Sequence, residues 1–397
     1  MARVGIQPTV LLAKPWLPDA LAQRLPKYRH LWKLPERETR DGIDIFFARY
    51  LHIPQYRRPQ ATVRACCRAL WRTLKRHGLT AAFDVIHAQG AWPVGLAAPK
   101  LARVLATPFL TTLHIQDDSQ LYERPAGRKL YREMLRSTDT MITVGSPMDQ
   151  FLDELAFTGR RARIPNGIDP RKIQAAIHAA GSAPPPARDW GHVISVSNLW
   201  PTKGVACNLL ALARLDAAIW QSYTIVGEGP ERQSLERLAR DLGIAERVVF
   251  TGRLSNHEAL QHIARADIFA LPSWQEAFGV VYLEAMACGK PVIGCRGQGA
   301  QDIFDHERQG LLVEPPSAED KEPLDQEPLD QEPLVASLTD ALERLLTDSS
   351  AAREMGEAGR ERARELTWDT NAERTSALYR QAIERAKPAS SPAEAVV

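Results

Sequence analysis

The chain has 397 residues, of which 44% are hydrophobic and 25% are charged, and its formal net charge is +2. This length predicts two domains, each large enough to bury its own core, and the composition is typical of a soluble globular protein. No apolar run approaches the ~18 residues of a membrane-spanning helix. No D-x-D, H-E-x-x-H or paired Cys/His motif is present, so we expect neither a metal ion nor a cofactor.

The charge is unevenly distributed along the chain. Residues 1–180 contain 28 Lys and Arg against 15 Asp and Glu, a net charge of +13, whereas the remainder, with 22 against 33, carries −11. A basic half indicates an anionic partner, either a membrane surface or nucleic acid. Because no basic motif interleaved with aromatic residues accompanies it, we expect no nucleic-acid partner.

The cysteines and the first residues indicate the compartment. The five cysteines show no C-x-x-C spacing, which is typical of reduced thiols in the cytosol. Gln7 and Pro8 interrupt the first apolar stretch, which makes it a poor signal peptide. We expect a cytoplasmic protein, and a peripheral position on the inner face of the membrane stays open.

The first half alternates strand-like and helix-like segments, a pattern that predicts a parallel sheet with helices on its faces. The predicted strands are Thr9 to Ala13, Ile43 to Ala48, Val85 to His87, Phe109 to Leu113 and Met141 to Val144. The clearest helical pattern runs from Ala61 to His77.

That helix carries arginines every four residues, at Arg64, Arg68, Arg72 and Arg76. A basic amphipathic helix can lie on an anionic membrane. It can equally pack on a sheet with its basic face in solvent, and the sequence does not decide between the two interpretations.

His114 follows the predicted strand Phe109 to Leu113. A lone histidine is usually structural, but the carboxyl end of a parallel strand is where open α/β sheets bind ligands. Further along, the prolines of residues 181–189 predict a stiff linker. We therefore expect a first domain over residues 1–180 and a second over residues 190–375.

The second domain opens with a strand and a loop that carries Lys203, which could neutralise a diphosphate leaving group. Gly227 and Gly229 then lie between a strand and a helix. Arg232 replaces the third glycine of G-x-G-x-x-G, so this is not a dinucleotide fingerprint.

The most informative stretch is Ser273 to Pro291, which places Glu276 in a loop and Glu284 on a short predicted helix, Val280 to Cys288. The predicted strands Asp267 to Leu271 and Pro291 to Gly294 flank it. Eight helical positions at about 1.5 Å each would separate the two carboxylates by ~12 Å. That is too far for a glycosidase pair, so the spacing favours two separate functions.

Four segments follow this stretch. Gly297 and Gly299 precede a short helix, either as a phosphate loop or as a simple tight turn. The repeat E-P-L-D-Q within residues 318–334 predicts a surface insertion loop, because regular prolines disfavour helix and strand. Helical patterns from Val335 to Ala386 close the second domain, and residues 376–386 are expected to pack back on the first. Residues 387–397 are predicted to be a disordered tail.

The segment E-A-F-G-V-V-Y-L-E-A-M-A-C-G-K-P-V-I-G resembles the E-x7-E element of the retaining glycosyltransferases of family 4, including those of teichuronic acid synthesis. The segment R-I-P-N-G-I-D-P, Arg163 to Pro170, is similar to the turn that closes the family's first domain. The resemblance implies an α/β protein of the GT-B fold, with two Rossmann-like parallel-sheet domains facing a cleft. The family's first strand, Gly-rich loop and helix have no counterpart before Thr9, so the first domain is expected to lack its first βα unit.

The resemblance also implies roles for individual residues. Glu276 would orient the donor sugar, Lys203 would stabilise the leaving phosphate, and His114 would contact the sugar. Glu284 would hold the ribose, and main-chain atoms around Arg253 would meet the base. The remaining positions implied to bind substrate are Asn198, Gly227, Phe278, Gly279, Val280, Gly299 and Asp117. The family has an arginine where Asn198 stands. Asp117 matches the acid of the family's H-G-x-D element, whose glycine is replaced here by Ile115.

The function that this resemblance implies is transfer of a hexose, with retention, from a UDP- or GDP-hexose to a lipid-linked or growing glycan of the cell envelope. The alternative is a non-catalytic partner that binds a nucleotide or a membrane, a truncated homologue without turnover. A GT-B sugar epimerase is the third and least favoured hypothesis.

Overall fold

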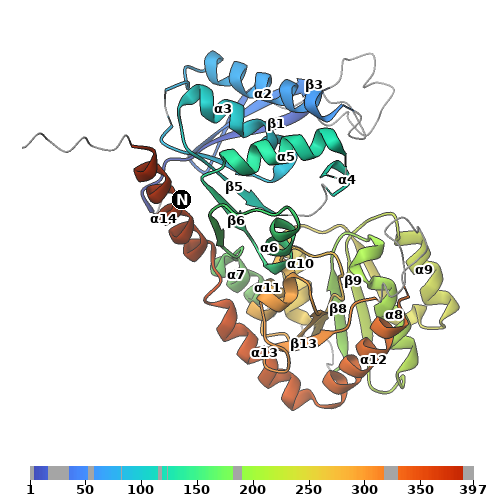
Figure 1. Ribbon diagram of the computed structural model, residues 1–397. Coiled ribbons are helices and arrows are strands. Elements are labelled where there is room, and N and C mark those ends of the chain that lie inside the picture. Colours follow the sequence, from blue (N-terminus) through green and yellow to red (C-terminus); the bar gives the residue numbers. More distant parts are fainter. Residues whose placement is uncertain are drawn as a thin grey trace, which may run out of the picture. The chain divides into compact units, whose positions relative to one another are not determined.

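The computed structural model describes residues 4–16, 35–51, 58–81, 83–114, 119–122, 124–181, 190–316 and 330–387. Asp117, residues 182–189 of the predicted linker, residues 317–329 around the repeat and the tail from residue 388 lie outside the described residues. The chain divides into two compact units (Figure 1). The first comprises Met1–Val144, Met148–Ile164 and Ala372–Val397, and the second comprises Gly145–Pro147 and Pro165–Asn371.

The described strands of the first unit form two sheets, a three-stranded one in the order β1-β3-β2 and a four-stranded one in the order β4-β5-β6-β7. The four-stranded sheet is parallel throughout, and β1 is parallel to β3. The strands are β1 (Thr9–Trp16), β2 (Arg37–Arg40), β3 (Ile43–Leu51), β4 (Ile86–Gln89), β5 (Phe109–Leu113), β6 (Thr140–Thr143) and β7 (Arg161–Arg163).

The strands predicted for this half are confirmed, although several run longer, and β2 was not predicted. β2 pairs antiparallel with β3 and consists of Arg-Glu-Thr-Arg, so it lacks the apolar alternation that marks a strand in the sequence. Between the edge strands β1 and β4 lies an apolar cavity of about 140 Å³, lined among others by Leu11, Leu74 and Ile86. The parallel sheet of this unit has four strands and is shorter than the six-stranded sheet of the second unit.

Helices cover the sheets of the first unit. They are α2 (Pro59–Arg76), α3 (Leu96–Leu105), α4 (Ser119–Tyr122), α5 (Pro125–Ser137), α6 (Ser146–Glu154) and the part of α14 (Trp368–Ala386) from Ala372 onward. Helices α2, α3 and α5 lie side by side (Figure 1). α2 confirms the predicted helix, and it packs on β3 through apolar residues such as Val63 and Leu70 while Arg64, Arg68 and Arg72 stay exposed.

The second unit contains a six-stranded sheet in the order β10-β9-β8-β11-β12-β13, and every described pairing in it is parallel. Its strands are β8 (His192–Val196), β9 (Ser222–Val226), β10 (Val248–Gly252), β11 (Ile268–Ala270), β12 (Val292–Cys295) and β13 (Gly310–Val313). Its helices are α7 (Pro170–Gly181), α8 (Val205–Arg214), α9 (Arg232–Asp241), α10 (Asn256–Arg265), α11 (Val280–Ala287), α12 (Glu332–Thr347) and α13 (Ser349–Ala363).

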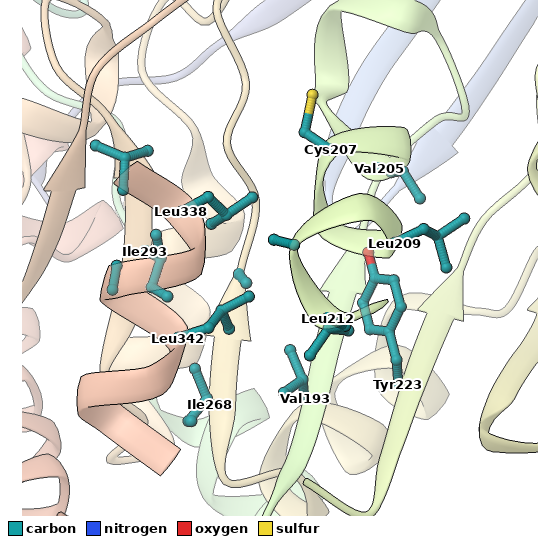
Figure 2. Packing of buried hydrophobic residues seen from close by; sticks show 14 of the residues in the cluster. Val193, Val205, Cys207, Leu209, Leu212, Tyr223, Ile268, Ile293, Leu338 and Leu342 are labelled. Atoms are coloured by element: carbon teal, nitrogen blue, oxygen red, sulfur yellow. The ribbon is translucent and has the colours of Figure 1, made fainter. Parts of the chain in front are cut away.

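One buried cluster of the second unit lies between this sheet and helices that include α8 and α12. Figure 2 shows Leu212 of α8 and Leu338 and Leu342 of α12 packed around Val193 and Ile268 of the central strands. All five side chains are buried. Burial of a leucine side chain contributes about 1.5–3 kcal/mol, so these helices are held on the sheet by their apolar faces.

Two boundaries differ from those expected. The change of unit comes between Ile164 and Pro165, not at residues 181–189, because α7 packs against α10 of the second unit. α12 begins at Glu332, within the stretch predicted to be a loop. Pro333 fits the first turn of a helix, where its missing N–H costs nothing, and Leu334 is buried in the core.

Candidate active site

The strand order of the second unit creates a switch point between β8 and β11. From β8 the chain proceeds outward through β9 and β10, and it then returns to the other side of β8 to begin β11, β12 and β13. Loops that leave adjacent strands in opposite directions open a crevice at the carboxyl edge of a parallel sheet. The loops that follow β8 and β11 carry Lys203 and Glu276.

Lys203 and Glu276 form an ion pair across this switch point. Lys203 ends a short 3-10 helix, Pro201–Lys203, and its Nζ donates to Glu276 Oε2 at 2.7 Å. The two side chains are only 21% and 18% exposed. A pair that is partly withdrawn from water interacts more strongly than a surface pair. The structure thus brings together the two residues that the sequence singled out for the leaving phosphate and the donor sugar.

Close backbone approach holds the two loops in place. The N–H of Trp274 donates to the carbonyl oxygen of Thr202 at 3.0 Å. Gly204 has a φ of +69°, and a Cβ there would lie 2.5 Å from the carbonyl oxygen of Pro272. A residue with a side chain would separate the loops, so the position of Lys203 relative to Glu276 depends on this glycine.

Helix α11 begins beside Glu276 with its N-terminus uncapped. Gly279 adopts a left-handed conformation with φ +88°, and no side chain in the described part of the chain caps the first turn, which begins at Val280 and holds no acidic residue. Phe278 is buried next to it. Free N–H groups and the helix dipole favour an anion at such a point.

The loop after β12 lies directly against the loop that carries Glu276. The N–H of Gly299 donates to the carbonyl oxygen of Glu276 at 2.9 Å, and the N–H of Glu276 donates to Gln298 Oε1 at 3.2 Å. A Cβ on Gly299 would lie 2.4 Å from the backbone nitrogen of Phe278. Because Gly299 has no side chain, it allows this contact, and the contact supports the loop that carries Glu276.

Glu284 lies further along α11 and pairs with a residue that sequence reasoning missed. Asn256 Nδ2, at the start of α10, donates to Glu284 Oε1 at 3.0 Å. Burial outweighs the hydrogen bond from Asn256, so the pKa of Glu284 is raised above its ordinary value. The capping box of Ser255 and Glu258 marks the start of α10, and this sequence signal could have located Asn256. Arg253, just before it, is exposed.

Asn198 and Gly227 belong to two neighbouring loops at the same edge of the sheet. Gly227 has a φ of +140°, and a Cβ there would lie 1.8 Å from the carbonyl oxygen of Ser197. The N–H of Leu199 also donates to the carbonyl oxygen of Glu228 at 3.0 Å. Gly227 thus has a structural reason to be glycine, and Asn198 is exposed on the loop that it supports.

His114 belongs to the first unit, where it directly follows β5. Its Nε2 lies 2.7 Å from Oε1 of Gln89, the last residue of β4. Sequence reasoning missed Gln89, although adjacent parallel strands bring their carboxyl ends together. Asp117 lies outside the described residues.

Metal binding and membrane spanning can both be checked in the described residues. Within the described ranges, no group of three or more His, Cys, Asp or Glu side chains is arranged to hold a metal ion. None of the helices in the described part of the chain is both long and apolar enough to cross a membrane.

Comparisons with known proteins agree with this architecture. The chain matches the model of glycosyltransferase family 4 over residues 2–172 and that of glycosyl transferases group 1 over residues 188–322. A GDP-mannose-dependent alpha-(1-6)-phosphatidylinositol monomannoside mannosyltransferase of Mycobacterium tuberculosis is 30% identical over 73% of this chain and 74% of that protein. A putative teichuronic acid biosynthesis glycosyltransferase of Bacillus subtilis is 25% identical over 80% of this chain and 79% of that protein.

Among solved structures, sucrose-phosphate synthase from Thermosynechococcus elongatus aligns with a TM-score of 0.71 and 24% identity, over 89% of this chain and 87% of that one. At this identity the likeness concerns the fold alone. Taken with the sequence relatives, the fold and the family models lead to one assignment. The chain has the GT-B fold and belongs to the group 1 glycosyltransferases of family 4, enzymes that transfer a sugar from a nucleotide sugar.

Proposed function

We propose that this enzyme transfers a hexose, with retention of configuration, from a nucleotide diphosphate sugar to a lipid-linked or growing glycan of the cell envelope. The observation that carries the proposal is the Lys203–Glu276 ion pair at the switch point, beside the uncapped N-terminus of α11. GDP-mannose is the first donor to test, because the mycobacterial relative is named for its dependence on it.

Lys203 and the first turn of α11 supply positive charge where the diphosphate would leave. Cleavage of the bond between the sugar and the phosphate puts negative charge on the leaving oxygen. A fixed cation and free N–H groups stabilise that charge most effectively in a site with little water. Lys203 fits this requirement because its side chain is 21% exposed and already held beside a carboxylate.

Glu276 and Glu284 would bind hydroxyl groups at the two ends of the donor. Carboxylates accept hydrogen bonds from sugar hydroxyls, and Glu276 lies at the helix start while Glu284 lies further along α11. Glu284 then binds the ribose, while Asn256 holds one carboxylate oxygen of Glu284 by a hydrogen bond. With retention, the acceptor hydroxyl attacks the face from which the phosphate leaves, and the leaving phosphate takes its proton.

The test is a turnover assay with GDP-mannose, GDP-glucose, UDP-glucose and UDP-N-acetylglucosamine and a set of glycan and lipid-linked acceptors. We expect one donor to be consumed with an acceptor present, and nuclear magnetic resonance of the product should show the α-configuration of the donor retained. A β-linked product would contradict the retaining mechanism. Nucleotide binding without consumption of any donor would instead support a non-catalytic partner.

A second proposal concerns the acceptor, which we place on an anionic membrane surface. Arg64, Arg68 and Arg72 of α2 are exposed on one side of the helix, and neither α2 nor the adjacent α3 carries an acidic residue. Val104 of α3 is 63% exposed. Clustered cations near an anionic bilayer contribute about 1 kcal/mol each.

Vesicle sedimentation tests this surface with a matched pair of variants. Binding to phosphatidylglycerol vesicles should fall about tenfold or more in Arg68→Gln/Arg72→Gln. The control, Arg237→Gln/Arg240→Gln, removes two exposed arginines from α9 of the second unit and should bind like the wild type. Equal losses in both variants, or no binding by the wild type, would contradict the proposal.

A further inference from the structure

Four polar side chains of the first unit share one face of the four-stranded sheet. Residues at every second position of a strand point to the same face, so His87 and Gln89 of β4 lie together, as do Thr112 of β5 and His114 just after it. Gln89 is the register partner of Thr112. α14 covers this same face, because its Tyr379 packs with Leu110 of β5.

Both ring nitrogens of His87 are engaged in this cluster. Nδ1 lies 2.5 Å from the hydroxyl of Tyr379, and Nε2 lies 2.6 Å from the hydroxyl of Thr112. The Tyr379 ring also meets the His87 ring edge-on, with centroids 5.5 Å apart. Burial lowers the pKa of His87 to about 4, so the ring is neutral at pH 7. His87 is therefore held in one orientation by α14 and β5.

Gln89 connects this cluster to His114. Its amide nitrogen lies 3.3 Å from each ring nitrogen of His87, and its carbonyl oxygen lies 2.7 Å from Nε2 of His114. An amide oxygen can only accept a hydrogen bond, so Nε2 of His114 is the nitrogen that carries hydrogen. In a neutral ring with its hydrogen on Nε2, Nδ1 carries none, and partial desolvation, which lowers the pKa of His114, favours this neutral form.

We infer that Gln89 is a positioning residue that holds neutral His114 as the Nε2–H tautomer, so that Nδ1 accepts a hydrogen bond from a hydroxyl of the donor sugar. Nδ1 makes no hydrogen bond to any described residue, and His114 keeps part of its surface in solvent although its neighbours partly desolvate the ring. In the other tautomer the same atom would be a donor, and the direction of the hydrogen bond to the sugar would reverse. The identity of the sugar hydroxyl as partner rests on the proposed function; the tautomer does not.

The tautomer can be measured directly by nuclear magnetic resonance on protein labelled with ¹⁵N-histidine. The chain has 10 histidines, and the His114→Asn variant assigns the signal of His114. In alkaline buffer we expect the Nε2–H form in the wild type, a mixture of tautomers in Gln89→Met, which lacks the acceptor, and the Nε2–H form again in Gln89→Glu, which keeps an acceptor oxygen. An Nδ1–H form in the wild type, or no change in Gln89→Met, overturns the inference.

Steady-state kinetics test the consequence for the reaction. We expect Gln89→Met to lower kcat about tenfold, the cost of one hydrogen bond to the sugar, and to leave the Kd of the free nucleotide unchanged. His114→Ala should lower kcat similarly, and the double variant should be no worse than either single one, because the two residues act through one contact. Additive losses, or a wild-type kcat in Gln89→Met, overturn the role of Gln89. A wild type that consumes no donor overturns the proposed function, while the tautomer spectra still decide on Gln89.

Discussion

At the scale of single residues, the candidate active site combines two charged side chains with glycines that let loops touch. Lys203 and Glu276 supply the charges, whereas Gly204, Gly227 and Gly299 each have a backbone carbonyl oxygen or nitrogen within 2.5 Å of where a Cβ would stand. In the proposed reaction the two charges would act on the donor, and the glycines let the loops that carry them approach closely. Both kinds of residue can be tested separately.

The first prediction concerns Lys203. Lys203→Ala should lower kcat with the preferred donor on the order of 100-fold or more, as loss of a transition-state charge partner does in other enzymes. Lys172→Ala removes an exposed lysine from α7, which makes it the matched control, and its kcat should stay at the wild-type value. Similar kinetics in the two variants would show that Lys203 does not act on the leaving group.

The second prediction concerns Gly299. Gly299→Ala places a Cβ 2.4 Å from the nitrogen of Phe278, so the loop must shift and the Glu276 loop with it. We expect a loss of roughly 1–3 kcal/mol in the free energy of unfolding and a lower kcat. Gly181→Ala is the control, because a Cβ at Gly181 meets nothing within 4 Å. Equal midpoints of urea unfolding in the two variants would rule out the steric role.

These residues show how far the sequence predicts a site. Glu276 and Lys203 could be found because they stand in motifs after strands of the parallel sheet. Asn256 and Gln89 stand in no such motif: the capping box beside Asn256 marks only a helix start, and each residue contacts one from another element, Glu284 and His114 respectively. A pairing between side chains distant in sequence depends on strand order and register, which a local motif does not contain.

At the scale of elements, α14 links the end of the chain to the first unit. Arg385 donates from two nitrogens to the carboxylate of Asp139, at 3.0 and 2.5 Å. Partial burial acts to raise the pKa of Asp139, but hydrogen bonds from Arg385 and Thr140 outweigh burial. The pKa is therefore lowered below the ordinary aspartate value of 3.8. Bidentate pairs of this kind are stronger than ordinary surface pairs.

The third prediction follows from this pair. The lowered pKa means that Asp139 contributes stability above its unfolded pKa and loses it as the pH falls through the folded value, so the loss occurs below about pH 4. Arg385→Gln should cost about 1 kcal/mol at pH 7, and the difference from the wild type should shrink on acidification. Urea unfolding followed by tryptophan fluorescence measures both.

Arg364→Gln is the matched control for this experiment, since Arg364 and Glu361 form an exposed pair one helical turn apart. It should unfold like the wild type at every pH. A difference between Arg385→Gln and the wild type that grows toward low pH would contradict the stabilising role of Asp139.

Element boundaries show a second limit of prediction from sequence. The regular prolines predict a loop over the whole repeat, yet its last residues form the first turn of α12 and bury Leu334. Proline excludes the interior of a helix but not its start, so the composition of the repeat alone could not locate the boundary. The sequence does not predict β2 either, because this polar edge strand has no apolar alternation.

At the scale of the whole molecule, the fold class was the most predictable feature. Alternating strands and helices predicted parallel sheets, and the structure contains one in each unit. The point where the chain changes unit was not predictable from the proline-rich segment, because α7 packs with α10 and α11. Packing between elements, not linker composition, decides to which unit a helix belongs.

The fourth prediction concerns the core of the second unit. Leu342→Ala truncates a side chain of α12 that is 0% exposed. It should lower the free energy of unfolding by about 2–5 kcal/mol. Val104→Ala, at a valine that is 63% exposed on α3, should cost less than about 0.5 kcal/mol. Comparable losses in the two variants would contradict the assignment of this core.

Nucleotide-sugar binding at the second unit's switch point is tested most directly by calorimetric titration of GDP, UDP and their hexose conjugates into the wild type, Lys203→Ala and Glu284→Ala. We predict selective binding of one nucleotide sugar by the wild type, with an affinity about tenfold or more weaker in each variant, because the diphosphate and the ribose each lose a partner at the second unit's switch point. Binding that is unchanged in both variants would contradict a donor site at this switch point, since the nucleotide would then bind elsewhere.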